Sequence, residues 1–113
     1  MILPQTGIAF RCRYQVNRDA RTVVIRTPER QAIAVTLIEC YTAPENLEAG
    51  RAAKAFLESL LEENDDPLTC WLPGQRIRNG HGRLWIGTVE VAEVMRRHGH
   101  AFRTRAEMEA AIR

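Results

Sequence analysis

The order of its hydrophobic patterns constrains the fold of this chain more than any other feature. Residues 7–18 alternate apolar and polar side chains, which is the period of a half-buried strand. Residues 22–27 and 31–40 are rich in β-branched side chains and predict two more strands. Residues 47–63 then carry apolar side chains at helical spacing, and this helix ends before Pro67, which cannot continue it.

The second half of the chain repeats strand patterns and then changes to helical ones. Residues 68–72 and 84–89 predict two further strands, and the loop between them, over 73–82, is rich in Gly and Arg. A short helix is expected over 91–98, and a last helix over 104–112 begins with a capping-box sequence. The order β-β-β-α-β-β-α-α predicts an α+β chain with one domain, residues 1–113. We expect a five-stranded OB-fold barrel with three helices, the first of which plugs the barrel between strands three and four.

Composition places few limits on function. The net charge of +2 is too small to imply a nucleic-acid partner by itself, but 15 of the 16 basic residues are Arg. The Arg guanidinium is a planar fork suited to phosphates, although the base composition of a genome can also favour Arg. Cys12, Cys40 and Cys70 lack metal-ligand spacing and are expected to be reduced core residues. The first ten residues do not read as a signal peptide, and no transmembrane segment is expected, which favours a cytoplasmic location.

Several short motifs follow one another between residues 10 and 103. Together, in this order and spacing, they resemble the staphylococcal-nuclease-like domain family. The motifs are Arg18-Asp19-Ala20-Arg21-Thr22-Val23, Thr42-Ala43-Pro44-Glu45, Gly50 with Ala53 and Phe56-Leu57, Gly74-Gln75-Arg76 with His81-Gly82-Arg83, and the segment from Val91 to Phe102.

The resemblance implies a particular chemistry, of which this chain retains only part. In the family, two aspartates and a backbone carbonyl bind calcium, a glutamate activates water, and two arginines stabilise the transition state. Glu45 matches the glutamate and Arg83 matches one arginine, whereas Leu37 replaces the other arginine. Arg21 and Thr42 replace the two aspartates, so the resemblance implies no metal site. No cofactor is expected unless the chain is an active nuclease, in which case calcium is implied.

The leading hypothesis is a catalytically degenerate domain that binds single-stranded DNA or RNA, or another anionic partner, in the former active-site groove. The residues expected to contact phosphates are Arg21, Thr42, Arg76, Arg78 and Arg83. Other roles stay open for several of these residues. Glu45 and Arg83 can instead form stabilising salt bridges or anchor a loop. Trp71 and Trp85 can stack on bases or belong to the core.

Two rival hypotheses stay open. The first is an active metal-dependent phosphodiesterase in which Asp19, Glu39 and Glu45 supply carboxylates to a rearranged site. The second is a protein-interaction or assembly module that retains only the scaffold. The acidic run over 62–66 is expected to repel nucleic acid from the end of the long helix.

Overall fold

Six strands and three helices follow one another along residues 6–113, the part of the chain that the computed structural model describes. The expectation of no signal peptide rests partly on residues 1–5, which lie outside the described part. The elements are β1 (Ile8–Asn17), β2 (Thr22–Arg26), β3 (Ala32–Leu37), α1 (Glu48–Glu62), β4 (Leu68–Leu72), β5 (Gly80–Ile86), β6 (Val89–Glu90), α2 (Val91–Arg97) and α3 (Arg105–Ala111). The predicted α+β class and the three helices are therefore confirmed, whereas the predicted number of five strands is corrected to six.

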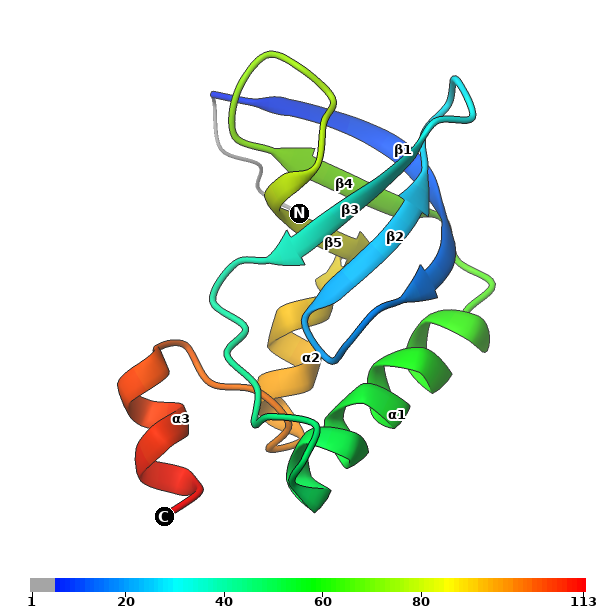
Figure 1. Ribbon diagram of the computed structural model, residues 1–113. Helices are drawn as coiled ribbons and strands as arrows, with labels where there is room; N and C mark the ends of the chain where they lie inside the picture. The colour runs from blue at the N-terminus through cyan, green and yellow to red at the C-terminus, as the bar shows by residue number, and fades with distance from the viewer. Residues whose placement is uncertain (1–5) are drawn as a thin grey trace.

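The pairings of the first five strands close into a ring. Antiparallel pairs join β1 to β2, β2 to β3, β1 to β4 and β4 to β5. A parallel pair joins β3 to β5 over Val35–Leu37 and Gly80–Gly82, so each of these five strands has two partners within the ring. The sixth strand, β6, pairs only with β5. Figure 1 shows the strands at one end of the molecule and the helices at the other.

Strand β1 changes its partner halfway along its length. Residues Ile8–Cys12 pair with β4, and the half that begins at Arg13 pairs with β2. The register shifts between Tyr14 and Val16, and an irregularity of this kind bends a strand and increases its twist. The long alternating segment of the sequence therefore becomes one curved strand that serves two neighbours.

The core lies inside the ring and continues onto two helices. The inward side chains of the strands, such as Ile25, Leu37 and Leu84, are fully buried. The apolar face of α1 covers them with Ala53, Leu57 and Leu61, as its helical spacing predicts. Helix α2 adds Val91, Ala92 and Met95 to the same cluster.

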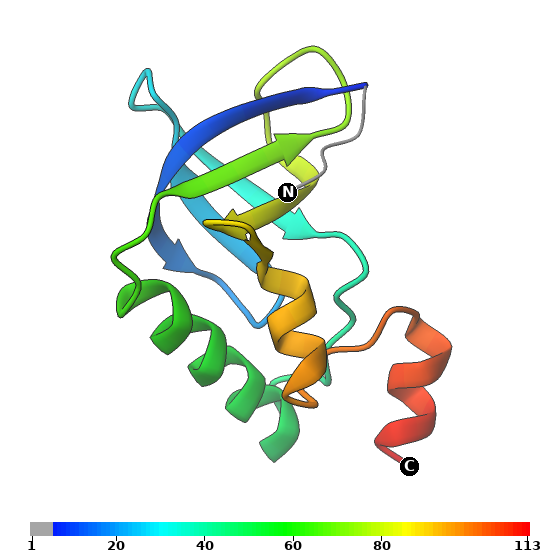
Figure 2. The same ribbon diagram turned by 180° about the vertical axis from the view of Figure 1, so that it is seen from behind.

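Helix α3 contributes nothing to this core. None of its residues is buried, and Figure 2 shows it standing apart from the other helices. Its start follows the predicted capping pattern, because the Thr104 side chain accepts a hydrogen bond from the Glu107 backbone N–H at 3.2 Å.

The ends of two predicted strands were wrong for a backbone reason. The third strand was expected to reach Cys40, but it ends at Leu37 because Glu39 adopts a left-handed conformation, with φ of 54°. The fifth strand was expected over 84–89, but it begins at Gly80 and ends at Ile86. Gly87 then turns the chain with φ of 59°, and β6 folds back onto the end of β5.

The three cysteines are buried and form no disulfide. Burial raises the pKa of both Cys12 and Cys40 to about 12, and it also raises the pKa of Cys70. Thiols of this kind pack as small apolar groups, as expected. No helix among residues 6–113 is both long enough and apolar enough to cross a membrane.

Candidate functional site

The turn between β1 and β2 is organised by Asp19. Its Oδ1 accepts hydrogen bonds from the backbone N–H groups of Arg21 and Thr22, each at 2.7 Å. The Asn17 side chain donates to the Asp19 carbonyl at 3.1 Å and to the Lys54 carbonyl of α1 at 3.4 Å. Asp19 therefore fixes a turn, in the way that short acidic side chains commonly do, and the turn places Arg21 directly before β2.

Arg21 is held by the end of β3 and the segment that follows it. Its Nε donates to the Leu37 carbonyl at 3.2 Å, and its backbone carbonyl accepts from the Leu37 N–H at 2.9 Å. The guanidinium carbon lies 4.3 Å from the centroid of the Tyr41 ring, a cation–π distance. The two motif positions 21 and 37 are thus neighbours, and the Arg21 guanidinium lies against Leu37 and Tyr41.

Arg83 lies at the centre of a network of charged groups. It pairs with Glu90 at 2.8 Å and with Glu39 at 3.0 Å. The second oxygen of Glu39 pairs with Arg103 at 3.0 Å, and its carbonyl accepts from Arg96 at 2.7 Å. The network therefore joins the turn after β3, strand β5, helix α2 and the segment before α3.

The network also shifts the acidity of its members. Burial acts to lower the pKa of the Arg83 guanidinium, but the hydrogen bonds to Glu90 and Glu39 outweigh it and raise that pKa. The hydrogen bond from Arg83 lowers the pKa of Glu39, against a smaller opposing effect of burial. Each group is thereby held in its charged form, as expected for a structural ion pair.

Glu45 belongs to a different contact. Its carboxylate pairs with Lys54 of α1 at 3.4 Å, and its carbonyl accepts from Arg51 at 3.1 Å. Both carboxylate and ammonium are more than one-third exposed, so this pair is weak. No ion pair joins Glu45 to Arg83, and each of the two forms salt bridges with other residues, as the alternative interpretation predicts.

Thr42 lies half-buried directly after Tyr41. It does not cap α1, because the N-cap position of that helix is Leu47. Its neighbour Ala43 is buried, and the Pro44 carbonyl accepts a hydrogen bond from Leu47 N–H at 3.0 Å. The loop that carries Thr42 is therefore a tight connection from β3 to α1.

The residues at the positions that the resemblance assigns to a metal do not fit calcium. Calcium takes hard oxygen ligands, usually several of them carboxylates. Here Arg21 brings a positive charge, Asp19 already accepts two backbone N–H groups, and Glu39 is bound by two arginines. Within residues 6–113, no three His, Cys, Asp or Glu side chains lie close enough together to hold an ion, so Asp19, Glu39 and Glu45 do not form one site.

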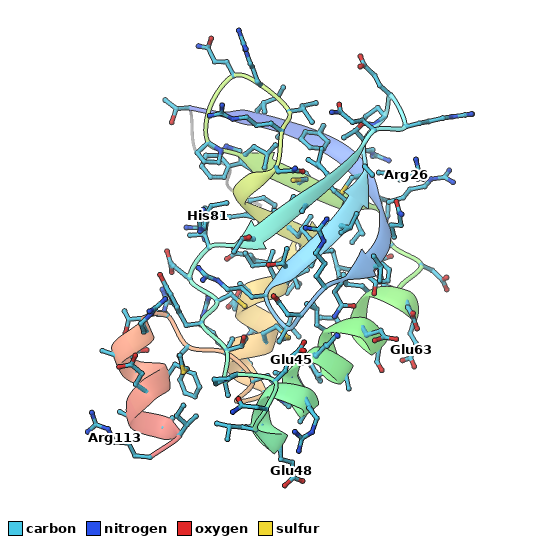
Figure 3. The ribbon with its side chains drawn as sticks, in the orientation of Figure 1. Arg26, Glu45, Glu48, Glu63, His81 and Arg113 are labelled. Atoms are coloured by element: carbon cyan, nitrogen blue, oxygen red, sulfur yellow. The ribbon has the colours of Figure 1, made fainter. Side chains whose placement is uncertain are left out.

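Arg76 and Arg78 lie on the exposed loop between β4 and β5. The loop is tied to β3, because the Asn79 side chain accepts a hydrogen bond from the Ala34 N–H at 2.8 Å. Neither arginine forms an ion pair with any described residue, and no Asp or Glu occurs between residues 73 and 82. His81 follows and projects outward from β5 in Figure 3, where it is labelled. Among the residues expected to contact phosphates, Arg76 and Arg78 are the exposed ones.

The two tryptophans are not available for stacking on bases. Trp71 is 8% exposed and its indole N–H donates to the Thr6 carbonyl at 3.0 Å, whereas Trp85 is 6% exposed. The core interpretation of these residues is therefore confirmed.

Two motif glycines allow close approach of the backbone. A Cβ at Gly50 would lie 1.9 Å from the Pro44 carbonyl oxygen, so α1 can pack on the Ala43-Pro44 loop only with glycine there. A Cβ at Gly82 would lie 2.6 Å from the Trp71 carbonyl oxygen. The Gly50 contact thus joins two motifs that were matched separately in the sequence.

The sequence did not reveal the partners of Arg83. Glu90 and Arg103 lie just outside the motif from Val91 to Phe102, and only the tertiary structure brings Glu90 to Arg83 and Arg103 to Glu39. The arginines of β1 and of the β2–β3 hairpin were also not among the predicted site residues. The sequence pattern that could have indicated them is the placement of Arg11 and Arg13 on the polar face of the first strand.

No model of a known protein family matches this chain, and no curated protein matches it. The assignment of function therefore rests on the residues and contacts described above.

Proposed function

We propose that this chain is a degenerate staphylococcal-nuclease-like domain that binds single-stranded nucleic acid through the phosphate backbone and does not cleave it. In this proposal the ring of five strands is an OB-type barrel, and the face that would carry the family active site has become a binding surface. Calcium takes no part in this proposal, because the available side chains do not suit it.

Two structural features support the family and the OB assignment. The ring order β1-β2-β3-β5-β4, with α1 between β3 and β4, agrees with a five-stranded Greek-key barrel plugged by a helix. The contacts of Gly50 with the Ala43-Pro44 loop, and of Gly82 with β4, give a physical reason for two motif glycines. Both observations concern the scaffold, so the binding function needs separate support.

The separation of charge along the molecule carries the functional proposal. Residues 8–13, the β2–β3 hairpin and the β4–β5 loop contain six arginines and one carboxylate, Glu29. The arginines are Arg11, Arg13, Arg26, Arg30, Arg76 and Arg78. Residues 48–66, by contrast, contain six carboxylates and only Arg51 and Lys54 as basic residues. Figure 1 shows the hairpin and the loop at the end of the molecule away from the helices, so a polyanion is attracted to the sheet end.

The phosphate contacts are assigned first to Arg76 and Arg78. Both are exposed, and neither has a carboxylate partner among the described residues. Arg21 and Arg83 match positions of the family active site, but each already bonds to the protein. Thr42 and these two arginines therefore contact the bound nucleic acid more weakly and contribute less to affinity.

The test is binding of a fluorescently labelled oligothymidylate over a range of salt concentrations. Affinity should fall as salt rises, with a log–log slope that loses about 0.7 for each phosphate contact removed. The double variant Arg76→Ala/Arg78→Ala should therefore show a slope about 1.4 units shallower than the parent protein. The same samples, given calcium and a long incubation, should leave the DNA intact.

A matched control removes two arginines from the helical end. Arg97 pairs with Glu93 on α2, and Arg105 lies in α3, so Arg97→Ala/Arg105→Ala changes the net charge equally. This control should retain the parent slope. Equal decreases of the slope in the two double variants would mean that net charge alone causes the effect. Salt-independent binding or calcium-dependent cleavage would overturn the proposal.

A further inference from the structure

A groove is lined by residues other than those of the site described above. It encloses about 1130 Å³, and it is bounded on one side by β1 with the β2–β3 hairpin and on the other by the end of α1 with the turn before β4. It follows the stretch in which β1 passes from one partner strand to the other. None of Arg21, Glu45, Arg76 or Arg83 lines it.

One wall of the groove is basic. Arg11, Arg13, Arg26 and Arg30 line it, and all four are exposed. Arg13 and Arg26 are direct cross-strand partners, and like charges in that position destabilise a sheet. None of the four forms an ion pair with a carboxylate among residues 6–113. The wall thus concentrates positive charge that the described protein does not neutralise.

Arg30 adds a second unfavourable feature to the same wall. It follows Pro28 and Glu29 in a tight hairpin turn, where its N–H donates to the Thr27 carbonyl at 2.9 Å. Its φ of 66° is left-handed, at a turn position that glycine occupies without strain. Its carbonyl also accepts a hydrogen bond from Arg26 at 2.9 Å. Strain and like-charge repulsion that meet at one surface indicate a functional use of that surface.

The other wall is acidic and the groove between the walls is partly apolar. Glu62 and Asp66 line the second wall, both exposed, and they form no ion pair with the arginines opposite. Tyr14 and Pro67 line the groove as well. The half-buried Tyr14 hydroxyl donates to Asn17, which holds the ring in place. A ligand that fills the groove therefore needs an anionic end, a hydrogen-bond-donating end and a flat apolar part.

We propose that this groove binds a nucleotide, either free or at the end of a nucleic-acid strand. The phosphates contact the four arginines, whose forked guanidinium groups suit phosphate oxygens. The amino group of the base or the sugar hydroxyls donate hydrogen bonds to Glu62 and Asp66, and the base lies against Tyr14 and Pro67. The proposal concerns a separate surface and holds whether or not Arg76 and Arg78 bind a strand.

The experiment uses the whole chain and three probes: adenosine 5′-diphosphate, inorganic pyrophosphate and an oligothymidylate. Calorimetry measures affinity, and backbone amide NMR shifts locate the site. The diphosphate should bind more tightly than pyrophosphate and shift amides in residues 11–15, 26–30 and 61–68. An oligothymidylate that shifts the same amides when the free nucleotide does not would identify a strand end as the source of the ligand. Shifts confined to residues 74–83 for every probe would overturn the groove while leaving the phosphate-backbone proposal intact.

Four variants separate the roles of the walls. Arg13→Gln should weaken both adenosine 5′-diphosphate and pyrophosphate about tenfold, yet the unliganded protein should unfold at no lower urea concentration than the parent. Arg30→Gly should weaken both probes while raising that concentration. Glu62→Gln should weaken the nucleotide severalfold but strengthen pyrophosphate, because it removes a negative charge. The control, Arg97→Gln, should leave both affinities unchanged. Equal effects of Arg13→Gln and Arg97→Gln, or equal effects of Glu62→Gln on both probes, would refute the assignment.

Discussion

Replacing Arg83 by methionine decides whether this residue is a structural cross-link or a phosphate contact. Methionine keeps an unbranched apolar stem and removes the charge and both hydrogen bonds. The side chain of Arg83 is 22% exposed and that of Glu90 only 16%. The strength of their bond, at 2.8 Å, should therefore lie between that of an exposed ion pair and that of a buried one. Surface pairs are worth at most about 1 kcal/mol, and hydrogen bonds to buried charged groups about 1.5–3 kcal/mol.

The expected cost of this substitution is about 2 kcal/mol. The bond to Glu90 contributes most of it, because that carboxylate is left without its partner in a poorly hydrated place. Glu39 loses less, since Arg103 still pairs with its second oxygen. For a chain of this length the loss lowers the melting temperature by about 8 °C.

Urea unfolding followed by circular dichroism measures this cost, with a cycle that includes Glu90→Gln. The double variant should unfold within about 1 kcal/mol of the Arg83→Met single variant, because the uncompensated carboxylate is then gone. Oligothymidylate binding by folded Arg83→Met should fall less than threefold. A variant with parent stability and a binding loss of tenfold or more would refute the cross-link and restore Arg83 as a phosphate clamp.

Two further predictions concern the packing and the charge network. Gly50→Ala should destabilise the fold by about 1–3 kcal/mol, because its Cβ would lie 1.9 Å from the Pro44 carbonyl oxygen and α1 would have to shift. Urea unfolding measures this loss, and it is compared with the effect of Ala52→Gly at an exposed site of the same helix. The bond from Arg83 holds the pKa of Glu39 below its ordinary value of 4.5. The contribution of Glu39 to the free energy of unfolding is therefore complete above pH 4.5, and it is lost as the pH falls through the lower pKa of the folded state. Glu39→Gln should accordingly flatten the loss of stability in acid, and an unchanged pH profile would contradict the role given to this carboxylate.

The sequence alone determined the order and type of the helices and strands whose apolar side chains recur with a clear helical or strand period. Helix α1 was located within one residue at each end, because its apolar side chains recur at helical spacing and Pro67 stops it. Strand β4 was placed over its full length, and Thr104 was placed as a helix cap. These features depend on residues that are near one another in the chain, so local composition is enough to specify them.

The tertiary structure decided which side chains meet. Arg83 and Glu39 are 44 positions apart, and only the closure of the ring through β3 and β5, followed by the left-handed turn at Glu39, brings them to 3.0 Å. The same closure leaves Arg76 and Arg78 without carboxylate partners among the described residues, and the partner change of β1 places Arg13 opposite Arg26. Strand register sets these contacts, and register depends on packing across the whole sheet, which a local pattern does not contain.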